Sequence, residues 1–247
     1  MKSECPISRN ISLLESDDPQ VKLSAVEALG RFMSKRAVEP LLELTKTETD
    51  VKVRRSLMLS LSLLGDDKVL PILLDVIKND SDIETRRNAA GGLRFFGDKI
   101  NAQYLVSLML DESDKSIRNV LVSTVIFLRD KTLIPQLLWY FEMVESQKLK
   151  ECLLEIMGSF DDQRTKELLI KCISPEFSRE IRLIATISMG KLDDVSFIPH
   201  LFEIYKNDEN EEIRIRAEKF LDELSILLGY SSIDQMVLDY IQKSKEV

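Results

Sequence analysis

The sequence predicts an all-α protein, a right-handed α–α superhelix of about seven antiparallel helix pairs with a helix that closes its C-terminal end. Three observations predict this fold. The sequence repeats with a period of 32 residues, each period holds two stretches with the apolar spacing of a helix, and the 247 residues include only 8 glycines and 7 prolines. So few turn-forming residues argue against the many tight turns of an all-β fold.

The period is clearest in a column of basic residues, called the basic ladder below, that recurs every 32 residues without an insertion. Self-similarity at such a period is typical of repeat architectures, in which each unit packs only on its neighbours. The basic ladder consists of Lys22, Arg54, Arg86, Arg118, Lys150, Arg182 and Arg214.

A cap column of residues suited to a helix N-cap stands four positions before the basic ladder. These side chains accept a hydrogen bond from a free backbone N–H in the first helical turn, so each predicts the start of an inner helix. Apolar or small residues follow at the spacing of one helix face, as at Val21, Ala25, Ala28, Leu29 and Phe32. The cap column consists of Asp18, Asp50, Asp82, Asp114, Ser146, Ser178 and Asn210.

A second, outer helix completes each period. Its proline, as at Pro71 and Pro135, falls within the first turns, where a missing N–H costs least. Short loops make consecutive helices antiparallel neighbours. We expect a single domain over residues 1–247 with a capping helix at about 232–243, and repeats at roughly 7–32, 36–64, 67–96, 99–128, 131–160, 163–192 and 195–228.

These recurring motifs resemble the HEAT repeat. The pattern reads Asp-x-x-Val/Ile-Arg, then Ala-x-x-Ala-Leu-Gly, then Asp, then Pro-x-Leu, and the stretch from Asp18 to Leu44 is among its closest matches. It is most similar to the short HEAT-like repeats of phycobilisome (bilin) lyases and covers roughly residues 7–228. The resemblance implies a solenoid. It implies no single function, because HEAT repeats serve scaffolds, transport receptors and a few enzymes.

Composition narrows the function classes. The 34 basic and 42 acidic residues give a formal net charge of −8, which disfavours a protein built to bind phosphate backbones. No apolar run is long enough to span a membrane, and no secretory signal is visible. The scattered Cys5, Cys152 and Cys172 indicate a reducing compartment. We therefore expect a cytoplasmic protein that binds neither membrane nor nucleic acid.

The sequence offers no catalytic residue, metal site or cofactor site. His200 is the only histidine, and no cysteine or carboxylate pair is spaced to form a metal site with it. HEAT-like deoxyhypusine hydroxylases bind iron through repeated His-Glu pairs, which this chain lacks, so that activity is excluded. The glycines of residues 91–97 suggest a phosphate loop, but no strand precedes them and no Gly-Lys-Ser/Thr follows.

We interpret the basic ladder as structural. The acidic members of the cap column recur at the same interval, so each cation is expected to pair with a cap or carboxylate of an adjacent repeat. The alternative is that seven aligned cations bind an anionic polymer.

A binding groove is predicted on the inner helices of the second to fourth repeats. Three columns that point away from the core combine apolar side chains with arginines there, which is the composition of interface cores. Gly91 lies among them, where a missing side chain leaves room for a ligand; close helix packing is the alternative reason for the Gly91–Gly92 pair. The predicted groove comprises Arg55, Leu59, Leu63, Arg87, Gly91, Arg94, Phe95 and Phe127.

Three functions are weighed. The first is a non-enzymatic scaffold or adaptor whose concave groove holds a peptide or helix of a partner protein, and the arginines would suit an amphipathic segment with acidic residues. The second, implied by the resemblance, is a chaperone-like bilin lyase subunit. The third is nucleic-acid binding, as in HEAT-like alkylpurine DNA glycosylases, which the net charge of −8 and the single tryptophan disfavour.

Overall fold

The computed structural model describes residues 5–243, and within that range the chain consists of helices joined by turns and short irregular connections, with no strand. Fourteen α-helices follow one another as seven antiparallel pairs, and a fifteenth ends the described chain. This confirms the predicted all-α fold of stacked helix pairs. No helix among these residues is long and apolar enough to cross a membrane.

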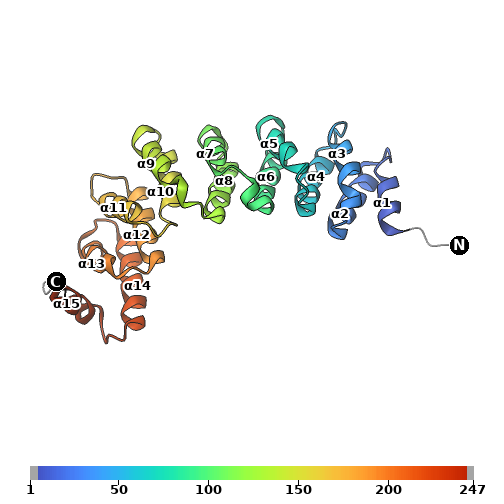
Figure 1. Cartoon of the computed structure of the whole chain (residues 1–247). Coiled ribbons are helices and arrows are strands. Elements are labelled where there is room, and N and C mark those ends of the chain that lie inside the picture. The colour runs from blue at the N-terminus through green and yellow to red at the C-terminus, as the bar shows by residue number, and fades with distance from the viewer. Residues whose placement is uncertain (1–4, 244–247) are drawn as a thin grey trace. The chain divides into compact units, whose positions relative to one another are not determined.

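The chain divides into two compact units, Met1–Leu128 and Arg129–Val247. In the first unit the inner helices α2, α4, α6 and α8 pack on one another in sequence, and each packs on the outer helix before it (Figure 1). Its helices are α1 (Pro6–Leu13), α2 (Pro19–Phe32), α3 (Val38–Thr45), α4 (Val51–Leu64), α5 (Val69–Asn79), α6 (Ile83–Gly92), α7 (Ala102–Asp111) and α8 (Lys115–Leu128).

The second unit repeats the arrangement, with α10, α12 and α14 packed in sequence and α15 packed on α13 and α14. Its last helix falls where the capping helix is predicted. That all seven pairs form one domain stays a prediction. The helices of this unit are α9 (Ile134–Met143), α10 (Gln147–Met157), α11 (Gln163–Cys172), α12 (Arg179–Leu192), α13 (Ile198–Asn207), α14 (Glu211–Leu227) and α15 (Ile233–Lys243).

The cap column begins the inner helices. Asp50 accepts hydrogen bonds from the Lys52 and Val53 N–H groups at 2.9 and 3.1 Å, and Asn210 accepts one from Ile213. Ser146 also precedes its helix but makes no such bond. Side-chain capping of this kind stabilises a helix by about 1 kcal/mol, so six of the seven helix starts are fixed locally.

The core consists of aliphatic side chains between the two helix rows. Ala25 and Leu29 of the predicted stripe are fully buried, whereas Val21 and Ala28 are half-buried. Phe32, the last member of the predicted stripe, is exposed at the end of α2, so the stripe does not reach the core there. The helix ends at this residue, and Met33 takes a left-handed conformation, so no further helical turn covers the Phe32 ring.

The third repeat departs from regular helix geometry. Gly91 and Gly92 end α6, and residues Leu93–Lys99 continue as a tighter 3-10 helix. Gly97 interrupts it with a φ of 51°, a left-handed conformation that glycine adopts at little cost. Phe96 remains buried while Phe95 is exposed, so this segment places one aromatic ring in the core and one on the surface.

Candidate functional site

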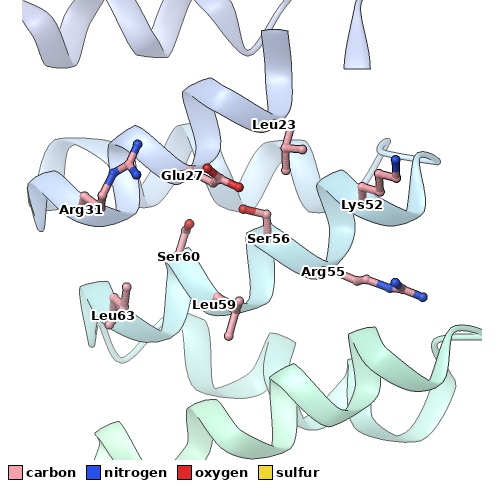
Figure 2. Close-up of a pocket in the computed structure, with 9 residues that line it drawn as sticks. All are labelled: Leu23, Glu27, Arg31, Lys52, Arg55, Ser56, Leu59, Ser60 and Leu63. Atoms are coloured by element: carbon pink, nitrogen blue, oxygen red, sulfur yellow. The ribbon is translucent and has the colours of Figure 1, made fainter. Parts of the chain in front are cut away.

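A first cleft runs between the inner helices α2 and α4, within the first unit. It has a volume of about 480 Å³. Figure 2 shows Arg31 at one end, Lys52 and Arg55 at the other, and Glu27 between them. The lining residues are Leu23, Glu27 and Arg31 from α2, with Lys52, Arg55, Ser56, Leu59, Ser60 and Leu63 from α4.

A second cleft, of about 460 Å³, runs between α4 and α6. Leu59 and Leu63 line it as well, so they form a ridge shared by the two clefts. We call the two clefts and this ridge the paired cleft. Leu59 and Phe95 are 50% and 52% exposed, which makes them accessible to a ligand. The second cleft is lined by Leu59, Ser62, Leu63, Arg87, Asn88, Gly91, Gly92, Arg94, Phe95 and Val120.

Gly91 and Gly92 have different surroundings. A Cβ added to Gly91 would meet only the Val120 Cγ1, at 3.9 Å, so this glycine leaves open space in the second cleft. A Cβ added to Gly92 would lie 2.7 Å from the Ser62 Cβ, and it would also meet the buried Ser62 Oγ. Gly92 therefore permits close packing of α6 on α4, whereas no contact among the described residues requires a glycine at position 91.

The two glycines should respond oppositely to the same substitution. Gly91→Ala should raise the free energy of unfolding by up to about 1 kcal/mol, because alanine restricts the unfolded chain and meets no clash. Gly92→Ala should lower it by about 1–3 kcal/mol, the usual cost of overpacking a core. Urea denaturation of the two variants measures both effects. A loss at Gly91 equal to that at Gly92 would show that both glycines serve packing.

The charges of the paired cleft fall into two groups. Arg55 donates to Asp82 at 2.6 and 2.8 Å, and these bonds hold the pKa of the Asp82 carboxyl well below its usual range. Arg87 pairs with Glu84 on its own helix at 2.6 Å. Among residues 5–243, Arg31, Lys52 and Arg94 have no carboxylate partner. The paired cleft therefore keeps three cations available on its rim.

Seven of the eight predicted groove residues line the paired cleft. Phe127 does not, although it is exposed on α8. The prediction missed the wall formed by Leu23, Glu27 and Arg31. These residues occupy the same three columns as the predicted set, one period earlier. The column positions could have indicated this wall. In the first repeat, however, the columns hold one apolar, one acidic and one basic residue, which does not have the composition of an interface core.

Four members of the basic ladder reach a carboxylate of the next repeat. Lys22 pairs with Glu48 at 2.7 Å, Arg54 with Asp80 at 3.0 Å, Arg86 with Glu112 at 3.9 Å and Arg182 with Asp208 at 3.1 Å. Each acid stands two residues before a cap-column residue and accepts that residue's backbone N–H at 2.7–2.8 Å. The pairing acids are thus not the caps; the cap Asp82 pairs with Arg55 instead.

Three ladder members make no such ion pair among residues 5–243. The residue 26 positions after Arg118 is Val144, and within the described residues the Arg118 side chain donates only to the Ser113 carbonyl, at 3.1 Å. Its buried Nε has no hydrogen-bond partner within residues 5–243. Lys150 has Glu176 at the equivalent position but lies over the Phe141 ring instead. Arg214 has Tyr240 there and donates to the Asp208 carbonyl at 2.7 Å.

The other polar residues singled out in the sequence do not form a site with one another. His200 is half-buried in α13, and burial lowers its pKa. In the described part of the chain no group of three or more His, Cys, Asp or Glu side chains could hold a metal ion. Cys172 is buried, which raises its pKa to about 12 and leaves its thiol protonated at neutral pH.

A family model described as HEAT repeats matches residues 7–94 and 48–125. Residues 7–125 are HEAT repeats. The predicted resemblance is thereby confirmed for this part of the chain, which includes all the residues that line the paired cleft. No curated protein matches the sequence at a significant level.

Similar solved structures cover nearly the whole length of this chain. YibA from E. coli is 15% identical, with a TM-score of 0.55 over 97% of this chain and 92% of its own. The complex of CpcE and CpcF of phycocyanin lyase from Nostoc sp. PCC7120 is 18% identical, with a TM-score of 0.49 over 98% of this chain and 96% of its own. Human deoxyhypusine hydroxylase in complex with glycerol is 17% identical, with a TM-score of 0.42 over 89% of this chain and 84% of its own. At these identities the YibA likeness supports the helical-repeat fold and no activity.

Proposed function

We propose that this chain is a non-enzymatic scaffold or adaptor that holds a segment of a partner protein in the paired cleft. The observation that carries the proposal is the pairing of an exposed apolar ridge, Leu59 and Leu63, with cations that lack a carboxylate partner. Interface centres combine large apolar side chains with arginine, and this surface does so at the junctions of three successive repeats.

The chemistry of the paired cleft also favours a class of partner. Arg31, Lys52 and Arg94 lie around the apolar ridge, so they would meet acidic side chains on a segment whose apolar residues cover Leu59, Leu63 and Phe95. A helix with one apolar face and acidic flanks meets both requirements, and so does an extended peptide of similar composition. The members of the basic ladder that pair within the fold contribute no free charge to such an interface.

The proposal is tested by affinity capture with three forms of the chain. The cleft variant, Leu59→Asp with Leu63→Asp, should lose at least one protein that the unchanged chain retains, because carboxylates would repel both the apolar face and the acidic flanks of the partner. Both leucines are partly exposed, so the fold should survive, and thermal unfolding checks this. The purified partner is then titrated against each form.

Ile215→Asp supplies the matched control. Ile215 is an exposed aliphatic residue on α14, in the second unit, and should be replaceable without loss of the partner. If the cleft variant and the control captured the same proteins as the unchanged chain, the paired cleft would not be the binding site.

A further inference from the structure

The end of α14 exposes a run of apolar residues. Ile226 and Leu227 are 75% and 72% exposed, Leu228 is exposed as well, and so is Leu238 on α15. Single exposed leucines are common on protein surfaces, but three consecutive exposed aliphatic residues are unusual without a function. The acidic residues near the C-terminal end predict a polar cap, and α15 does pack there, yet it leaves these four side chains uncovered. We call them the C-terminal apolar surface.

This run belongs to an ordered helix end. The Tyr230 N–H donates to the Ser225 carbonyl at 2.8 Å, and the Gly229 N–H donates to the Ile226 carbonyl at 3.1 Å. Gly229 has a φ of 79°, which completes a Schellman motif. The Tyr230 hydroxyl also bonds to Asp239 and so ties the turn to α15. The C-terminal apolar surface is therefore presented in a defined conformation.

The charges beside the C-terminal apolar surface are acidic. Asp222 lies one turn before Ile226 on α14, and Asp234 lies one turn before Leu238 on α15, so each shares a helix face with an exposed apolar residue. Neither aspartate has an ion pair among residues 5–243. The nearby lysines are already engaged, Lys219 with Glu223 and Lys243 with Asp239.

The paired cleft carries the complementary combination, namely exposed apolar residues flanked by cations without carboxylate partners. Two C-terminal apolar surfaces brought together would oppose acid to acid, which costs binding energy. We propose that the chain self-associates head to tail, with the C-terminal apolar surface of one copy seated in the paired cleft of another. The proposed self-association does not rest on the proposed function, because a second copy can occupy the cleft even if no other protein ever binds there.

A head-to-tail contact leaves one cleft and one C-terminal apolar surface free on every assembly that does not close into a ring, so further copies can add. Sedimentation velocity of the full chain, from micromolar to several hundred micromolar concentration, should therefore show a mass that rises steadily. The assemblies should shrink in high salt, which screens the aspartates from the cations.

Two variants test whether the contact is head to tail, and a third tests its charges. The cleft variant, Leu59→Asp with Leu63→Asp, and a tail variant, Ile226→Ser with Leu227→Ser, should each be monomeric on their own. Their equimolar mixture should form a heterodimer that grows no further, since only one intact cleft can meet one intact C-terminal apolar surface. Asp222→Lys with Asp234→Lys, which alters exposed charges alone, should weaken association at least about tenfold even if the apolar variants fold poorly.

Three results would overturn the proposal: an unchanged chain that stays monomeric throughout, a cleft variant that still dimerises, or a mixture of the two variants that stays monomeric. The second result would indicate tail-to-tail pairing instead. The tail variant keeps its cleft, so it should still bind the captured partner. Loss of self-association and loss of the proposed function are therefore measured separately.

Discussion

Arg182→Ala should lower the free energy of unfolding by about 3–5 kcal/mol, the cost of leaving a buried charge without its partner. The side chains of Arg182 and Asp208 are 4% and 6% exposed. Arg182 donates to both Asp208 oxygens, at 3.1 and 3.3 Å, and to the Phe177 carbonyl at 3.0 Å. Removing it leaves the Asp208 carboxylate buried and able to accept only backbone hydrogen bonds. Urea denaturation followed by circular dichroism measures the loss.

Arg118→Ala is the matched control on the same ladder. Arg118 has no ion pair in the described part of the chain and makes one hydrogen bond, to the Ser113 carbonyl, so its loss should cost only about 1 kcal/mol. Equal losses at the two positions would show that the carboxylate partner does not determine the contribution of a ladder cation. A small loss of unfolding free energy at Arg182 would contradict its assignment as a buried ion pair that joins two repeats.

The affinity for the captured partner should fall at least about 30-fold when Phe95→Ala is combined with Arg87→Glu, equivalent to about 2 kcal/mol. Phe95 supplies an exposed aromatic surface at the second cleft, and Arg87, which pairs with Glu84, lines the same cleft. Replacing the cation by an acid should also repel an acidic partner. Isothermal titration with the purified partner measures the change.

The fold should tolerate these two changes, because Phe95 is half exposed and leaves no buried cavity when truncated. The far-ultraviolet spectrum should stay unchanged. Lys219→Glu, at an equivalent inner-helix column in the seventh repeat, should alter the affinity little, since Lys219 lies in the second unit and lines neither cleft. If both variants weakened binding equally, the binding surface would lie elsewhere.

The helix starts could be predicted because their cause is local. A residue such as Asp50 accepts backbone N–H groups two and three positions away, so the cap and the helix it begins lie in one short stretch of sequence. Because the cap residues recur every 32 residues, the same argument predicts the start of the inner helix in every repeat. The columns that contain Leu59, Gly91 and Phe95 followed from helix geometry alone, and the structure brings them together around the paired cleft.

The partners of the basic ladder could not be predicted in the same way. Glu48 and Asp80 stand two residues before the caps, in loops whose path depends on how one repeat stacks on the next. Sequence spacing favoured the caps because they recur as regularly. The exposure of Phe32 and Ile226 likewise depends on where α2 and α14 end relative to their neighbours, which the helical period alone does not specify.

The close contacts between glycine and serine on successive inner helices make the repeats unequal. Serine Cβ atoms approach to within 2.7 Å of where a Cβ would stand on Gly30 and Gly92, and these serines, Ser60 and Ser62, both belong to α4. Excising residues 33–64, a whole period, would preserve the helical frame yet set Gly30 opposite Gly92, with neither serine between them. At the α2–α4 contact the glycine belongs to the first helix, and at the α4–α6 contact it belongs to the second. Shortening the array at this point would therefore require a new small-residue pair at the splice.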